Sequence, residues 1–506
     1  MGSKGTSLLV SRSDDPASIQ AVSAFLPGQV EVARAIAGIP PLTGREYARV
    51  YLHRVATNAP LPPQVLSDVF AHPVQSVEHI DDLGTVRPHQ PFHALADRPR
   101  VLNVLAGGAL PLNSGARRRA FELTLHLNRQ GIPTELLIGA LGAARRSRLS
   151  TTLQAISPAI HTYRRIRPPL PLRLRLRREA ERMYRLGHGV LRPAPDLFVD
   201  RLATRASADG ANRLKELISS GRYGAVIVNY AWMSGMIEEV REATPEVIWV
   251  CDTHDVQFIR GSTLDEGGPR LWVDPDAQRD AELAALRGYD AVLAISEADE
   301  EVFRRFLPGV RIVAAPPGCE YARLEIPSEP SVPPFRFGFI GGNMSANAMA
   351  LEYLLREWWP QILRVSPGSR LTVAGSVCRR GRARKAMSGQ HGVTPLGFVP
   401  SLRSFYEGVD VVLNPVLVQG GLNFKSMEAL AAGRLLITNP LGALCLGEGA
   451  PVIVADEGTS LSDHLEGFLS NPLALHRIRS EGQQWGVDRF GEQRAYRELR
   501  GLLEGI

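Results

Sequence analysis

Short apolar runs alternate with longer amphipathic segments over most of the chain beyond residue 100. A strand that is covered on both faces of a parallel sheet reads as a continuous apolar run, so these runs predict buried strands. The segments between them have the length of helices and favour helices on both faces of each sheet. The pattern predicts an α/β protein with strands at residues 101–105, 225–228, 247–250, 291–295, 311–315, 335–340 and 411–413.

Two of these strands open a repeat that is typical of a Rossmann-like domain. The strands at 101–105 and 335–340 are each followed by glycines and an amphipathic segment of helix length. A proline-rich linker at 316–334 separates the two repeats. Loops that bind ligands collect at the carboxyl ends of parallel strands, so two such domains facing across a cleft are expected to share a ligand. The first loop lacks the G-x-G-x-x-G pattern, which does not support a dinucleotide.

Residues 1–98 differ from the rest of the chain. They contain several prolines and a few apolar patterns of helical spacing, at 30–36 and 46–55. No motif in them points to a function. We interpret this segment as an N-terminal extension of unknown role.

The composition is typical of a soluble globular protein. The 506 residues are 44% hydrophobic and 22% charged, with no apolar run near the ~20 residues that span a bilayer. The chain starts without the apolar core of a signal peptide. Its four cysteines lie far apart and make no metal-binding or redox spacing, which favours a reducing cytoplasm.

Positive charge is concentrated between Arg164 and Arg192, where ten arginines stand against Glu179 and Glu181. Such a run is often simply a solvated helix face. It also suits the anionic head groups of a membrane surface, or an acidic acceptor. Few aromatic residues are interleaved with the arginines, so nucleic acid is not an expected partner.

The most specific chemistry lies between Asn414 and Gly433, in the segment NPVLVQGGLNFKSMEALAAG. Its glycine pair precedes a predicted helix at 424–432, which places Lys425 and Glu428 one turn apart on one face near the helix N-terminus. Free N–H groups and the helix dipole favour an anion there. A Lys/Glu pair at this spacing is often only a solvated ion pair. Lys425 is one of only four lysines beside many arginines, which favours a chosen role such as binding a diphosphate.

Four segments resemble, in order, the donor domain of GT-B glycosyltransferases, in particular the family-four (group 1) type. They are FIGGNMSANAMALEYLLREWWPQI, RLTVAG, GVTPLGFVPSLRSFYEGVDVVLNP and the segment of Lys425 and Glu428. The resemblance implies a Rossmann-like acceptor-side domain at 99–318, a Rossmann-like donor domain at 335–484, and a helix at 485–506 that crosses back to the first domain.

The resemblance also implies the donor contacts. Lys425 is expected to contact the donor diphosphate and Glu428 the nucleotide ribose. Further donor contacts are expected from Gly341, Gly342, Asn347, Gly421 and Leu422, with Phe398 and Val399 near the nucleotide base.

The chain departs from the family pattern in two places. The usual motif has another glutamate eight residues before the second, where Gly420 stands. The arginine and lysine that often follow the first glycine loop are absent, and Asn343, Ser345 and Asn347 stand there instead. Lys425 is therefore expected to carry most of the positive charge on the diphosphate.

Candidate catalytic residues follow the strand at 247–250. In many family-four enzymes a histidine after this strand faces the donor sugar, and the resemblance implies this role for His254. Asp255, with Asp252 as a rival, is a candidate to accept the proton of the acceptor hydroxyl. Acceptor-side contacts are expected from Ser114, Gly115, Asn229, Tyr230, Trp232 and Arg260.

The resemblance implies a glycosyltransferase that moves a sugar, with retention, from a nucleoside-diphosphate sugar to the hydroxyl of a saccharide or lipid-linked acceptor. Asp274 and Asp276 have Asp-x-Asp spacing but lie in the first domain, so no metal and no cofactor are expected. We expect a role in polysaccharide or glycolipid synthesis in the cytoplasm, or at the inner membrane face through a peripheral contact of the arginine run. Two alternatives stay open: a catalytically silent GT-B subunit that acts as a partner or scaffold, and epimerisation of a nucleotide sugar.

Overall fold

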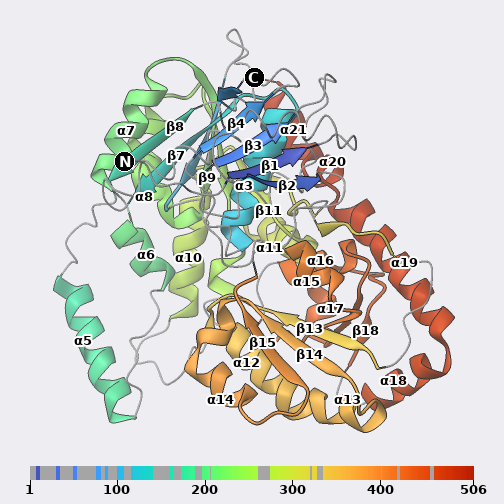
Figure 1. Cartoon of the computed structure of the whole chain (residues 1–506). Coiled ribbons are helices and arrows are strands. Elements are labelled where there is room, and N and C mark those ends of the chain that lie inside the picture. The colour runs from blue at the N-terminus through green and yellow to red at the C-terminus, as the bar shows by residue number, and fades with distance from the viewer. Residues whose placement is uncertain are drawn as a thin grey trace, which may run out of the picture. The chain divides into compact units, whose positions relative to one another are not determined.

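The computed structural model divides the chain into two compact units, Met1–Arg164 with Pro400–Ser404, and Arg165–Val399 with Phe405–Ile506. Each unit is described by itself (Figure 1). The structure describes residues 7–11, 30–34, 49–53, 76–80, 86–88, 100–107, 115–140, 157, 159–164, 172–188, 197–205, 207–259, 274–319, 322–326, 334–399, 402–418, 422–455 and 461–505.

The first unit begins with a five-stranded sheet in the order β2-β1-β3-β4-β5. Strands β1 to β4 run parallel and β5 pairs antiparallel with β4. Their bounds are Ser7–Ser11 for β1, Val30–Arg34 for β2, Arg49–His53 for β3, Ser76–Ile80 for β4 and Val86–Pro88 for β5.

The helical patterns expected at 30–36 and 46–55 are wrong, because β2 and β3 occupy them. The segments VEVAR and RVYLH carry valines and a tyrosine, which favour a pleated strand. Both are short, and short apolar segments cannot be assigned to helix or strand by periodicity alone. Residues 1–98 therefore contain a parallel sheet with one antiparallel edge strand.

The first unit also contains β6 (Arg100–Leu105), β7 (Thr134–Ala140) and β8 (Ile160–Arg164), which pair in parallel with β7 in the middle. The helix α3 (Gly115–Arg129) connects β6 to β7. The strand predicted at 101–105 is confirmed.

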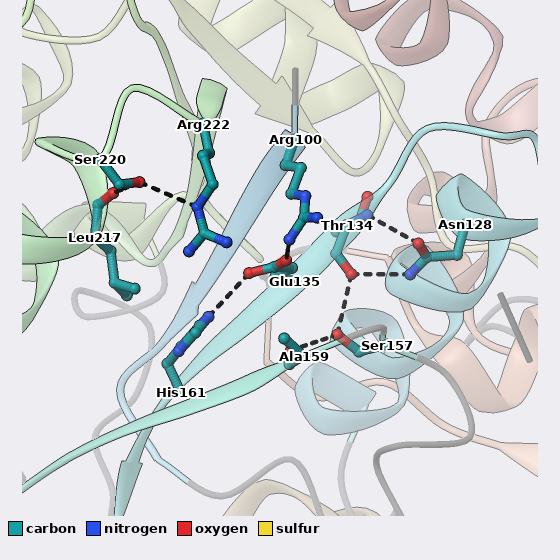
Figure 2. A network of polar contacts seen from close by, with 10 residues as sticks. All are labelled: Arg100, Asn128, Thr134, Glu135, Ser157, Ala159, His161, Leu217, Ser220 and Arg222. Atoms are coloured by element: carbon teal, nitrogen blue, oxygen red, sulfur yellow. Dashed lines mark hydrogen bonds and ion pairs between the residues drawn. The ribbon is translucent and has the colours of Figure 1, made fainter. Parts of the chain in front are cut away.

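A buried carboxylate links these three strands. Glu135, on β7, accepts a hydrogen bond from Arg100 on β6, and its Oε2 lies 2.9 Å from His161 Nε2 on β8 (Figure 2). The Glu135 side chain is only 1% exposed. A buried charge is tolerated when it is paired and hydrogen-bonded, so this cluster stabilises the sheet only while all three partners are present.

The second unit contains the parallel strands β12-β11-β10-β9. Each lies where an apolar run predicted it, within a few residues. The bounds are Tyr223–Asn229 for β9, Ile248–Asp252 for β10, Ala291–Ala294 for β11 and Arg311–Ala314 for β12. The helices in this part of the unit are α5 (Leu172–Gly187), α6 (Phe198–Arg205), α7 (Ala208–Ile218), η1 (Ala231–Met233), α8 (Ser234–Glu242), α10 (Pro275–Leu286) and α11 (Glu297–Phe306).

A six-stranded parallel sheet in the order β15-β14-β13-β16-β17-β18 forms the later part of this unit (Figure 1). The strands predicted at 335–340 and 411–413 are confirmed as β13 and β16. The bounds are Arg336–Ile340 for β13, Arg370–Ala374 for β14, Val393–Gly397 for β15, Val411–Asn414 for β16, Leu435–Thr438 for β17 and Ile453–Val454 for β18.

Helices connect these six strands, as the alternating pattern predicts for a parallel sheet. They include a π-helical turn, η3, in the middle of a longer helical stretch. The bounds are α12 (Ser345–Tyr353), η3 (Leu354–Trp358), α13 (Trp359–Val365), η4 (Ser376–Arg379), α14 (Gly381–Met387), α15 (Leu402–Glu407), α16 (Phe424–Ala431), α17 (Pro440–Leu446) and α18 (Leu461–Ser470).

The core of the six-stranded sheet is aromatic on one side. The ring of Phe337 on β13 meets that of Trp359 edge-on, with centroids 5.9 Å apart. Both residues are fully buried, and Trp359 Nε1 donates to the carbonyl oxygen of His391 at 2.8 Å. The indole is thus packed without leaving its N–H unpaired, as burial requires.

The chain ends in the helices α19 (Pro472–Phe490), α20 (Glu492–Ala495) and α21 (Arg497–Leu503). They contact the strand β12 and the residues that follow it. Glu498 Oε2 accepts from the backbone N–H of Ala314 at 3.2 Å, and Tyr496 Oη accepts from that of Gly318 at 3.1 Å. These bonds tie the C-terminal helices to the segment between the two sheets of the second unit.

Candidate active site

The helix α16 starts where the sequence predicts it and ends one residue earlier than expected. Asn414, at the end of β16, is fully buried and donates from Nδ2 to Ser426 Oγ at 2.7 Å. Gly433 follows the helix with φ near +63°, a backbone conformation that glycine adopts without strain. The strand end and the helix start are thus fixed to each other.

Lys425 turns toward the loop after β13. Its Nζ donates to Asn347 Oδ1 at 2.7 Å and lies 4.8 Å from the ring centre of Phe339. Burial lowers the pKa of Lys425 to about 8, although the charge of Glu428 acts in the opposite direction. The group is still mostly an ammonium at neutral pH, held by a neutral amide and an aromatic face.

Glu428 has a different partner. It is 6% exposed and accepts a hydrogen bond from the Tyr406 hydroxyl at 2.9 Å. The two side chains that the sequence places on one helix face are therefore each engaged with a residue from elsewhere in the chain. Tyr406 was missed in the sequence, because a buried aromatic residue in an apolar segment reads as core.

The glycine loop after β13 is held against the loop after β14. Gly375 has φ near +93°, and a Cβ built on it would lie 2.2 Å from the carbonyl oxygen of Gly341. The backbone N–H of Val377 donates to that same oxygen at 3.0 Å. Asn347 Nδ2 donates to the carbonyl oxygen of Gly342 at 3.1 Å. The structure thus brings Gly341, Gly342, Asn347 and Lys425 together.

The other residues predicted to contact the donor lie in different parts of the second unit or outside the described residues. Leu422 is buried just before α16. Phe398 follows β15 with 49% of its surface exposed, and Val399 beside it is half-buried. Gly421 lies outside the described residues, as does Gly420.

His254 follows β10 in a backbone conformation that is rare for residues other than glycine. Its φ is near +63°, and Tyr230, after the neighbouring strand β9, has φ near +78°. Residues held in such regions cost about 1–3 kcal/mol each and gather at functional sites. The backbone N–H of Tyr230 donates to the carbonyl oxygen of Asp252 at 2.8 Å, which couples the two strand ends.

The His254 imidazole is buried in a polar and aromatic environment. Its Nε2 lies 2.9 Å from Asn229 Oδ1 and 3.9 Å from Asp252 Oδ2. The ring stacks on Tyr230, whose ring stacks in turn on Trp232, with centroid distances of 4.3 and 5.0 Å. The predicted residues His254, Asn229, Tyr230 and Trp232 therefore form one cluster.

Asp255 is buried beside a second carboxyl group. It is 3% exposed and lies near Glu282 on α10, whose pKa is raised by burial and, to a smaller extent, by the charge of Asp255. Burial is the main cause of that shift and raises the pKa of Glu282 to about 8. Glu282 accepts from the backbone N–H groups of Gln257 and Phe258 at 3.0 and 2.7 Å. The loop after His254 is thereby anchored to α10.

Asp274 and Asp276 have structural roles at the start of α10. Asp274 caps the helix by accepting from the backbone N–H of Ala277 at 3.0 Å. Asp276 pairs with Arg279 at 2.7 Å. Within the described residues, no group of three His, Cys, Asp or Glu side chains could hold a metal ion.

Of the other residues predicted to contact the acceptor, only one lies within the described residues. Gly115 is the half-buried first residue of α3 in the first unit. Ser114 and Arg260 lie outside the described residues.

The parallel α/β sheets have the GT-B fold, which solved glycosyltransferase structures share. Residues 334–471 match the family described as Glycosyl transferases group 1. The matched residues contain the cluster around Lys425.

Solved structures share the fold at low sequence identity. Sucrose-phosphate synthase from Thermosynechococcus elongatus is 14% identical with a TM-score of 0.57, over 81% of this chain and 99% of that one. HepE from Anabaena, in complex with UDP and glucose, is 12% identical with a TM-score of 0.54, over 81% and 100%. TarM is 8% identical with a TM-score of 0.55, over 82% and 99%.

One curated relative is similar in sequence. An uncharacterised 44.6 kDa protein in the cps region of Klebsiella pneumoniae is 22% identical over 151 residues. The match spans 28% of this chain and 38% of that protein.

Proposed function

We propose that this protein transfers a sugar from a nucleoside-diphosphate sugar to the hydroxyl of a saccharide or lipid-linked acceptor. One observation carries the proposal: Lys425 at the start of α16 reaches the glycine loop after β13 through Asn347. A cation, free helix N–H groups and close-packed glycines are what a diphosphate needs. HepE has been solved with UDP-glucose, which supports this class of donor.

The chemistry follows from the charge that develops on the leaving diphosphate. A preorganised cation stabilises that charge as the bond to the sugar breaks, because no solvent has to reorganise. Lys425 supplies the charge, and Glu428, held by Tyr406, is proposed to bind the ribose hydroxyls. His254 is proposed to face the donor sugar. Asp255, with Asp252 as a rival, is proposed to accept the proton of the acceptor hydroxyl.

Retention at the anomeric carbon and independence from metal and cofactor are parts of the same proposal. Retention rests on the resemblance to family-four enzymes alone. Metal independence rests on that resemblance and on the position of Asp274 and Asp276, which lie away from the glycine loops. A role in polysaccharide or glycolipid synthesis draws on the relative in the cps region of Klebsiella pneumoniae.

The test is donor turnover in matched lysine variants. We expect Lys425→Ala to abolish consumption of the nucleotide sugar, and Lys385→Ala, an exposed lysine on α14, to leave it unchanged. Glu428→Gln keeps an acceptor for Tyr406 and is expected to weaken nucleotide affinity. Wild-type turnover in Lys425→Ala would refute the donor site, and no turnover in the wild-type protein with any donor would favour the silent subunit.

We also propose a membrane contact through α5, which lies within the arginine run. Four large apolar residues of this helix are exposed, in an arc of about 80° at 100° per residue. They are Leu172, Leu176, Met183 and Leu186, with exposed fractions of 69%, 63%, 66% and 39%. The opposite side is held inward, where Arg177 pairs with Asp200 on α6.

The charges beside this apolar stripe favour an anionic lipid surface. Arg175 and Arg182 flank the stripe on one side and Arg173 on the other, and all three are exposed. Glu179 lies within the stripe and pairs with Arg182 at 3.5 Å. A helix with an apolar face between arginines can lie in the head-group region of a bilayer. We therefore propose that the enzyme contacts an anionic membrane surface, and a cytoplasmic location at the inner membrane face is part of the same proposal.

No helix among the described residues is long and apolar enough to cross a membrane.

A further inference from the structure

Two cations contact a loop that has none of its own. The segment 341–347 reads GGNMSAN and contains neither lysine nor arginine. Lys425 reaches it through Asn347. Arg380, which precedes α14, donates from Nε to Asn343 Oδ1 at 2.9 Å and from Nη1 to Ser345 Oγ at 2.6 Å. Positive charge therefore comes to this loop from two other elements.

The backbone fixes the position of Arg380. The close approach of Gly375 to Gly341 brings the turn η4 onto the glycine loop, and Val377 bonds to the Gly341 carbonyl. The backbone N–H of Arg380 donates to the carbonyl oxygen of Val377 at 3.0 Å. Only the four residues of η4 separate Gly375 from the arginine. The side chain then spans a short gap to Asn343 and Ser345 at the start of α12.

The partners of Arg380 hold the guanidinium without neutralising it. Asn343 and Ser345 are uncharged, and within the part of the chain that the structure describes no carboxylate lies in ion-pair contact with Arg380. Arg382, two residues later, pairs with Glu352, and Arg356 pairs with Glu357. A guanidinium has five N–H donors. The two bonds to Asn343 and Ser345 leave three for a ligand.

We propose that Arg380 binds the diphosphate of the donor together with Lys425 and supplies the second positive charge that the loop after β13 lacks. This inference rests on the proposed function, since it assigns a further residue to the same donor site. The planar fork of an arginine can contact two phosphate oxygens at once, whereas an ammonium acts as a point charge. Arg380 therefore orients the diphosphate and distinguishes it from a single phosphate.

The test measures, by calorimetry, the affinity of the protein for UDP and for uridine. If the wild-type protein binds GDP, ADP, TDP or CDP in place of UDP, that nucleoside diphosphate and its nucleoside are used. Arg380→Gln keeps a donor for the loop but removes the charge, and Arg382→Gln, two residues later on α14, is the matched control. We expect Arg380→Gln to bind the diphosphate at least about tenfold more weakly, the size of one charge-assisted hydrogen bond. Affinity for the nucleoside is expected to stay unchanged, and Arg380→Lys to recover part of the loss.

The outcomes separate the two proposals. Equal diphosphate affinity in Arg380→Gln and wild type overturns the role of Arg380 and leaves the donor site intact. An equal loss of affinity for diphosphate and nucleoside, with a lower melting temperature, overturns it in favour of a purely structural role. If the wild-type protein binds no nucleoside diphosphate, the proposed function fails, and the assignment of Arg380 fails with it.

Discussion

At the scale of single residues, the candidate donor site places charged groups against neutral ones. Lys425 is held by the amide of Asn347 and the ring of Phe339. Each partner orients the ammonium without cancelling its charge, so the field remains available to an anion. The cost is a lowered pKa, which makes the charge of Lys425 depend on pH near neutrality.

Donor affinity is therefore expected to depend on pH. The pKa of Lys425 is about 8 in the free protein, so the ammonium is present below that value and lost as pH rises through it. A diphosphate binds the charged form, so its dissociation constant should rise above pH 8 and approach about tenfold per pH unit. The measurement is calorimetric titration of the nucleoside diphosphate across this range. Arginine keeps its charge across this pH range, so the affinity of Lys425→Arg should not fall above pH 8. If the affinity of this variant falls as steeply as that of the wild type, Lys425 is not the group that titrates.

His254 is expected to act on turnover more than on affinity. Alanine is strained at the φ of His254, so His254→Asn is the better variant because asparagine tolerates that conformation. We expect kcat to fall roughly 100-fold, within the range of general acid–base or transition-state contacts, with donor affinity little changed. Steady-state kinetics with a separate binding titration provide the check. A loss of affinity at constant kcat would exclude a role in the transition state.

The sequence singles out Lys425 and Glu428 as candidate donor contacts, but it does not predict which side chains hold them. Lys425 and Glu428 stand at a helix start, and local spacing is sufficient to recognise that. Asn347 lies 78 residues from Lys425 and Tyr406 lies 22 residues from Glu428. Contacts of this kind arise from strand order in the sheet, which periodicity does not encode. Arg380 was missed for the same reason.

At the scale of elements, the parallel strands beyond residue 100 were predictable because they are covered on both faces. A continuous apolar run between turn-forming residues, such as that of β9, is typical of a buried strand in a parallel sheet. The strands β2 and β3 were mistaken for helices, since five residues are too few to distinguish a period of 2 from one of 3.6. Strands as short as β11 and β16 were recognised because they are continuous apolar runs, so the apolar pattern, more than length, decided which elements could be recognised.

The contact between the loops after β13 and β14 depends on a single glycine. In Gly375→Ala the new Cβ would lie 2.2 Å from the Gly341 carbonyl oxygen, at a φ that alanine rarely adopts. We expect a loss of stability of at least about 1–3 kcal/mol from backbone strain alone, and weaker donor binding because the glycine loop shifts. Gly381→Ala is the matched control, since a Cβ there meets nothing within 4 Å. Thermal melting and donor titration that do not distinguish the two variants would contradict this account.

The helix α5 is expected to bind anionic bilayers. Wild-type protein should sediment with vesicles of phosphatidylglycerol and phosphatidylcholine, and much less with phosphatidylcholine alone. The double variant Leu176→Glu, Met183→Glu should lower the partition at least about tenfold, because two apolar side chains no longer enter the interface.

The control for this experiment is a double variant that introduces the same two negative charges on helices other than α5. Leu444→Glu with Leu473→Glu alters two leucines that are 61% and 72% exposed on α17 and α19. It should bind vesicles like the wild type. Equal loss in both double variants, or wild-type binding that ignores lipid charge, would exclude α5 as the membrane surface.

At the scale of the whole molecule, the second unit combines two parallel sheets with a shared C-terminal element. The helices α19 to α21 bond to residues at and after β12. Arg489 on α19 also pairs with Glu297 on α11. These contacts join the C-terminal helices to β12 and α11 in the earlier part of the unit. The two clusters that the sequence assigned to donor and acceptor chemistry belong to one compact unit.

The measurement that tests the central claim most directly is a thermal-shift and calorimetric screen of the purified protein against UDP-, GDP-, ADP-, TDP- and CMP-sugars. Lys425→Ala and Lys385→Ala are run beside the wild type. We predict that one nucleoside-diphosphate sugar selectively stabilises the wild type and Lys385→Ala, and that this stabilisation is lost in Lys425→Ala. No stabilisation by any of these sugars, or equal stabilisation of Lys425→Ala, would contradict the donor site proposed for this protein.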